Sequence, residues 1–101
     1  MSQNLDWDAL RTRFRTRLHL RMTEIDALME KMARGDDDEQ TALTALQLQF
    51  HSLAGIGGTY GYHDITELAR LAESVCAATP LHLNEVQRIT GEILCAATPP
   101  S

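Results

Sequence analysis

Apolar residues recur at steps of three and four along the first third of the chain. The series is Trp7, Leu10, Phe14, Leu18, Met22, Ile25, Leu28 and Met32. On an α-helix this spacing places all of them on one stripe, whereas a half-buried strand would need alternation with period two. We therefore predict a helix from Asp6 to Arg34, with a bend or break near His19–Met22, where the repeat loosens. Asn4 or Asp6 is placed to cap its start, and Gly35 to end it.

A second helix is expected to begin in the acidic run at 36–39, because acidic side chains are favoured at the positive end of the helix dipole. It ends in the glycine-rich stretch 55–61. Its inward stripe is Leu43, Leu46, Phe50, Leu53 and Gly57. No part of the chain alternates over the length of a strand.

The third and fourth helices are marked by start and stop signals. Asp64 followed by Glu67 has the spacing of a capping box, and Thr79–Pro80 would stop the third helix. Its expected core face is Ile65, Leu68, Ala72 and Val75. The fourth helix is predicted from Leu81 to Ala97, packed through Leu83, Val86, Ile89 or Thr90, Ile93 and Leu94.

Four amphipathic helices with short connections predict an all-α fold, an up-down antiparallel four-helix bundle. Residues 1–97 would form it as one domain, since a chain of 101 residues buries enough surface for a single core. Residues 98–101, with two consecutive prolines, are expected to be a frayed tail or the start of a linker.

Composition narrows the function. A net charge of -5 argues against a nucleic-acid partner, and the absence of an apolar run of about 18 residues argues against a membrane span. Without the apolar core of a signal peptide, we expect a cytoplasmic protein. We also expect a monomer, although the apolar faces of the long first helix leave dimerisation open. Cys76 and Cys95 lack metal-ligand spacing and are expected to be reduced, buried thiols, although the sequence also allows a disulfide between them.

The arginines between positions 11 and 21 form either a solvated face or a basic patch for an acidic partner.

His51 falls outside the inward stripe of the second helix. On a helical wheel it lies roughly 120° from the centre of that stripe, so we expect its ring to be at least partly in water. Gly55 follows one turn later and Gly58 at the next step. A glycine inside a helix costs about 1 kcal/mol relative to alanine, so these glycines either end the helix or keep the backbone beside His51 open to a partner.

The residues from His51 onward resemble the signature of histidine-containing phosphotransfer (HPt) domains. The matching positions are His51-Ser52-Leu53-Ala54-Gly55, Gly61 ten residues after the histidine, Leu68, and Leu71-Ala72-Glu73. The resemblance covers most of the second and third helices, and the rest of the chain agrees in length and helix count. One position departs from it, because many members of the family have lysine where this chain has Ala54.

The resemblance implies a phosphorelay carrier in two-component signalling, and not an enzyme. A ring nitrogen of His51 would accept the phosphoryl group from an aspartyl phosphate on a receiver domain of a response regulator or hybrid histidine kinase, and pass it on. The receiver would supply magnesium and a lysine, so the chain itself needs no cofactor and no metal. The alternatives are a degenerate bundle that docks a receiver without transfer, and a helical domain with no signalling role.

The expected phosphoryl environment consists of Gln47, Ser52, Ala54, Gly55 and Gly58. Expected partner contacts are Leu48, Gly55 and Gly61, although Leu48 could instead pack under the first helix or be a lone exposed apolar residue. His63 has a possible part in the site, while His19 and His82 are interpreted as surface residues.

Overall fold

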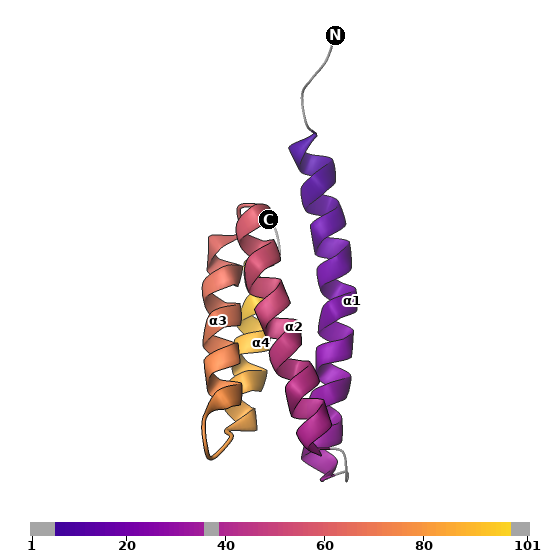
Figure 1. Cartoon of the computed structure of the whole chain (residues 1–101). Helices are drawn as coiled ribbons and strands as arrows, with labels where there is room; N and C mark the ends of the chain where they lie inside the picture. Colours follow the sequence, from indigo (N-terminus) through magenta and orange to yellow (C-terminus); the bar gives the residue numbers. More distant parts are fainter. Residues whose placement is uncertain (1–5, 36–38, 98–101) are drawn as a thin grey trace.

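The computed structural model describes residues 6–35 and 39–97, and within these ranges every regular element is an α-helix. The helices are α1 (Trp7–Arg34), α2 (Glu39–Thr59), α3 (His63–Ala77) and α4 (Leu83–Ala97). Successive helices run in opposite directions, and the N-terminal end of α1 projects beyond the other three (Figure 1). The prediction of an all-α four-helix bundle is confirmed. Residues 98–101, expected to be a tail, lie outside the described residues.

α1 is one continuous helix, so the bend or break expected at His19–Met22 is wrong. Leu18 and Met22 are both buried, which shows that the apolar stripe continues through this segment. The Asp6 carboxylate accepts a hydrogen bond from the amide of Ala9 (3.1 Å) and caps the helix start, as predicted. Gly35 ends the helix in the left-handed conformation with φ 71°, which glycine adopts without strain.

The core uses smaller side chains than the periodicity indicated. Leu43, Leu68 and Val75, expected to be inward, are only half-buried, whereas alanine or cysteine occupies the fully inward positions beside them. Helices that meet through small residues approach closely, and the longer side chains then cover the rim of the contact. The inward small residues of α2 and α3 are Ala42, Ala54, Ala69, Ala72 and Cys76.

Two helix starts differ from the predictions. α3 begins at His63 after Tyr62, without a side-chain cap, so the capping box of Asp64 and Glu67 is absent. The Thr66 amide instead donates to the carbonyl of Tyr62, which satisfies it within the helix. α4 begins at Leu83, two residues later than expected. The start of α2 in the acidic run falls partly on residues 36–38, outside the described ranges.

The two cysteines have different environments, and both are free. Cys76 is buried as expected, and this burial, with the nearby Glu73 carboxylate, raises the pKa of its thiol to about 11. Cys95 is exposed, so the expectation that it is buried was wrong. It lies beside Leu68 and Leu71 in the shallow groove between α3 and α4. No helix in the described ranges combines the length and hydrophobicity that crossing a bilayer requires.

α2 ends within the glycine-rich stretch 55–61, as predicted, and the first glycines of that stretch are helical. α2 continues through Gly55, Gly57 and Gly58 to Thr59. Gly57 is buried against α3, where a β-carbon would lie 2.8 Å from the Thr66 hydroxyl oxygen and 3.3 Å from the Tyr62 carbonyl oxygen. Gly55 is different, because a β-carbon there would meet no atom within 4 Å. Close backbone approach therefore explains Gly57 but not Gly55.

This difference generates a prediction for stability. Gly57→Ala should lower the free energy of unfolding by about 1 to 2 kcal/mol, because the added methyl group overpacks the α2–α3 contact. Gly55→Ala is the matched control and should stabilise the chain by up to about 1 kcal/mol through helix propensity alone. Urea unfolding followed by circular dichroism measures both. Equal effects of the two substitutions would contradict the close approach at Gly57.

Candidate functional site

His51 projects from the outer face of α2 into solvent. Its side chain is 74% exposed, although Phe50 and Leu53 on the same helix are fully buried. The wheel-based expectation that the ring stands clear of the core is confirmed. A neutral imidazole in this position has a ring nitrogen with a free lone pair that another molecule can reach.

Glu73 of α3 holds one side of that ring. Its carboxylate oxygen Oε2 lies 3.1 Å from Nδ1 of His51, and its side chain is 36% exposed. A carboxylate only accepts hydrogen bonds, so in the neutral ring the hydrogen between them belongs to Nδ1. The lone pair is then on Nε2, the nitrogen that points away from Glu73. The pair therefore selects which nitrogen can act as a nucleophile.

The contact between His51 and Glu73 depends on how α3 is seated against α2. The Thr66 hydroxyl donates to the Ala54 carbonyl oxygen (2.7 Å), and the Tyr62 amide donates to the Gly57 carbonyl oxygen (2.8 Å). These two bonds fix the antiparallel register at the end of α2. Seven residues along α3 from Thr66, on the same face, Glu73 reaches the level of His51. Glu73 belongs to the motif that resembles the family signature, but nothing in the sequence links it to His51, because that contact depends on the register between the two helices.

Of the five residues expected around a phosphoryl group, three lie on the surface. Ser52, Gly55 and Gly58 are exposed, and Gly55 leaves open space beside the helix. Gln47 is half-buried, one turn before His51. The described residues include no hydrogen bond from Gln47 or Ser52 to the ring.

Ala54 has a structural environment. It is only 6% exposed, and its carbonyl oxygen is engaged by Thr66. Its methyl group faces the helix contact and not the solvent around His51. The side chain at this position therefore adds no polar group to the site.

The expected docking residues are spread along the bundle. Leu48 is 64% exposed on α2, three residues before His51, so it does not pack under α1. Gly61 lies past the end of α2, in a turn with φ 83°. Because the last residue of α2 is eight positions after His51, Gly61 is more than about 12 Å along the helix axis from the histidine. The positive φ of Gly61 accounts for glycine in this turn, and Gly61 is not a neighbour of the His51 ring.

The remaining histidines lie apart from this site. His63 is the exposed first residue of α3, at the far end of the α2–α3 pair from Glu73. His19 and His82 are exposed, as expected. Among the described residues, no group of three or more His, Cys, Asp or Glu side chains is placed to hold a metal ion.

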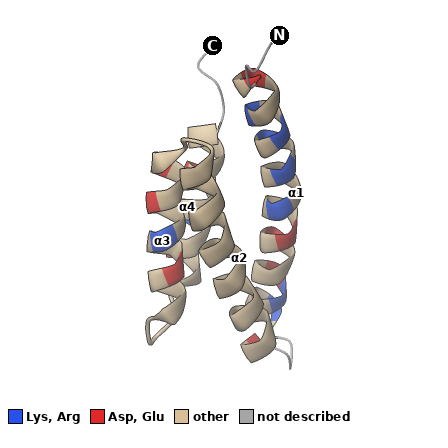
Figure 2. Cartoon of the chain, turned by 45° about the horizontal axis from the view of Figure 1, so that its top comes forward, with Lys and Arg blue, Asp and Glu red and all other residues tan. Residues whose placement is uncertain are grey.

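The charges around the site are unevenly distributed. Lys and Arg residues are frequent along the projecting half of α1 and occur again near its C-terminal end, while α2 has none (Figure 2). Two of the α1 arginines make hydrogen bonds across the bundle, Arg15 with the hydroxyl of Tyr62 between α2 and α3, and Arg21 with Gln49 of α2 (2.8 Å). They face the α1 side of α2, whereas His51 faces α3 through its contact with Glu73.

Comparison with known proteins adds no relative. No model of a protein family, no curated protein and no solved structure matches this chain. A four-helix bundle by itself serves many functions, so the fold does not assign one. Any indication of function therefore lies in His51 and its surroundings.

The exposure of the His51–Glu73 pair predicts that it contributes little to stability. Glu73→Gln should change the free energy of unfolding by no more than about 0.5 kcal/mol, because solvent screens exposed ion pairs. Glu67→Gln, an exposed glutamate two turns earlier on α3, is the matched control. Urea unfolding compares the two variants. A loss above about 1.5 kcal/mol for Glu73→Gln alone would show that the pair holds the bundle together.

Proposed function

We propose that this chain is a histidine-containing phosphotransfer domain that carries a phosphoryl group on Nε2 of His51 between receiver domains. The observation that carries the proposal is an exposed imidazole whose Nδ1 is engaged by Glu73. Residues 51–55, Gly61 and residues 71–73 resemble the family signature, and this resemblance points to the same reaction.

The chemistry follows from the two ring nitrogens. The lone pair of Nε2 attacks the phosphorus of an aspartyl phosphate, the N–P bond forms, and the P–O bond to the aspartate breaks as the carboxylate leaves with its electron pair. Positive charge develops on the ring during the attack. The Glu73 carboxylate stabilises this charge through the hydrogen on Nδ1. Transfer onward to a second aspartate reverses these steps.

The bundle acts in this proposal as a carrier and the receiver as the catalyst. The receiver supplies the magnesium ion and the lysine that stabilise the transferring group. This chain contributes a positioned nucleophile and an open surface, formed by the bare backbone at Gly55 and the exposed Leu48. Receiver domains and their carriers work in the cytoplasm, which is where we place the protein.

A second candidate function is docking to a receiver or a kinase without phosphotransfer. The observation in its favour is Ala54, whose buried methyl group occupies the position where many family members have a lysine. Such a domain would keep the binding face on α2 and would not accept the phosphoryl group. The two candidates differ in whether His51 becomes labelled.

Phosphoryl transfer from a panel of receiver domains charged with a radiolabelled small phosphodonor tests the proposal. The chain should acquire an acid-labile, base-stable label that His51→Gln abolishes while the helical circular dichroism is unchanged. His63→Gln, at another exposed histidine, is the matched control and should be labelled like the unaltered chain.

Two outcomes would contradict the proposal. Equal labelling of His51→Gln and the unaltered chain would remove His51 from the reaction. A receiver that binds the chain but never labels it would favour docking without transfer.

A further inference from the structure

Arg70 is the one basic residue on the two helices that form the site. α2 contains no lysine or arginine, and α3 contains only Arg70. Figure 2 shows a basic band on α3 between acidic ones. A phosphoryl group on His51 would add negative charge beside the Glu73 carboxylate, and this repulsion makes a nearby cation valuable.

The placement of Arg70 follows from its neighbours on α3. It is four residues after Thr66, which contacts the Ala54 carbonyl oxygen, and three residues before Glu73, which contacts His51. Residues at these spacings share one face of a helix, so Arg70 is on the face of α3 that borders α2. Along that border it lies between the level of Ala54 and the level of His51.

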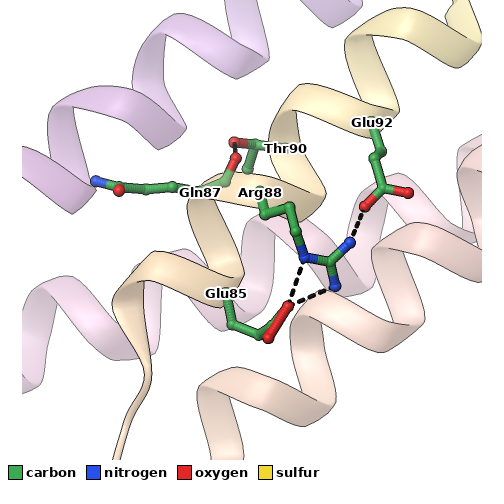
Figure 3. Close-up of polar contacts among 5 residues, drawn as sticks. All are labelled: Glu85, Gln87, Arg88, Thr90 and Glu92. Atoms are coloured by element: carbon green, nitrogen blue, oxygen red, sulfur yellow. Dashed lines mark hydrogen bonds and ion pairs between the residues drawn. The ribbon is translucent and has the colours of Figure 1, made fainter.

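Arg70 is also available for a new partner. It is exposed, and it makes no hydrogen bond or ion pair with the residues that the structure describes. Arg88 on α4 provides the contrast, because its guanidinium is engaged by Glu85 and Glu92 on either side (Figure 3). Glu67 precedes Arg70 by the same three residues that separate Glu85 from Arg88, yet the first pair is not formed.

The space beside the ring suits a phosphoryl group held between the two helices. Nδ1 points to Glu73, so a group on Nε2 lies on the side of the ring away from that carboxylate. No side chain projects from Gly55, one turn after His51, and a β-carbon there would meet nothing within 4 Å. A planar guanidinium with several donors is suited to bind phosphoryl oxygens.

We propose that Arg70 binds the phosphoryl oxygens of phosphorylated His51 and supplies, from α3, the positive charge that position 54 of α2 lacks. This inference rests on the proposed phosphocarrier function. Arg70 acts as a positioning residue, because it stabilises the charged product and takes no part in making the N–P bond. It also accounts for how a chain with Ala54 retains the reaction.

Chemical phosphorylation of the full chain with phosphoramidate tests this inference without any receiver. ³¹P NMR across a pH series follows the titration of the phosphoryl group, and the signal missing from His51→Gln identifies His51. In Arg70→Gln the titration midpoint should move to higher pH, because the dianion loses a neighbouring cation. In Arg70→Lys the titration midpoint should lie close to that of the unaltered chain, because the positive charge is kept. The difference should shrink at about 0.5 M salt, which screens exposed charges.

Arg13→Gln is the matched control, since it removes the same charge from an exposed site on α1. Its midpoint should stay at that of the unaltered chain. With a receiver that transfers, Arg70→Gln should shift the equilibrium away from phosphohistidine by about threefold, as expected for one exposed charge pair. Arg13→Gln should leave it unchanged.

The outcomes separate the two proposals. Identical titrations of Arg70→Gln and Arg13→Gln would overturn the role of Arg70, even where receivers still transfer to His51. A shifted midpoint in Arg70→Gln without transfer from any receiver would overturn the carrier function and leave the arginine contact standing. Failure of phosphoramidate to modify His51 while other exposed histidines react would contradict both.

Discussion

The close contact of α2 with α3 at Gly57 is the constraint on which the site depends. A β-carbon at this position would collide with Thr66, so only glycine lets the two helices approach this closely. The approach allows the Thr66 hydroxyl to bind the Ala54 carbonyl oxygen at 2.7 Å, which fixes the register between the helices. Glu73, two turns further along α3, then meets His51 across the same boundary. The buried packing contact at Gly57 thus positions Glu73 beside the exposed ring of His51.

The His51–Glu73 contact is weak as a stabilising interaction and specific as an orienting one. Exposed ion pairs contribute only about 0 to 1 kcal/mol to folding, because water competes for both groups. The same carboxylate nevertheless distinguishes Nδ1 from Nε2, and a nucleophile in a relay needs one defined nitrogen with a free lone pair. Arg70 would complete the arrangement by facing the product's negative charge. A carrier of this kind would hold its ring between an acid on one side and a cation on the other, while the receiver would provide the remaining catalytic groups.

The periodicity of the sequence predicted those features that depend on one helix alone. The apolar stripes located four helices, and the wheel placed His51 outside the core, because both depend only on the 100° rotation per residue. Contacts between helices were missed for the same reason. Glu73 becomes a neighbour of His51 only through the register of α3 on α2, which the bond of Thr66 sets, and the role proposed for Arg70 depends on the same register. The expected inward positions Leu68 and Val75 also failed, since close packing favoured Ala69 and Cys76. Gly57 did lie on the predicted stripe. The need for glycine at this position comes from the close approach of Thr66, which only the packing of both helices reveals.

The most direct measurement of the central claim is ¹⁵N NMR of the full chain with labelled histidine rings, before and after phosphorylation. We expect that neutral His51 carries its hydrogen on Nδ1, that Glu73→Gln weakens this preference, and that the phosphoryl group is bonded to Nε2. His19, His63 and His82, whose rings form no hydrogen bond among the described residues, are the internal references. A neutral ring with its hydrogen on Nε2, or a phosphoryl group on Nδ1, would rule out the roles given to Glu73 and to Nε2 of His51.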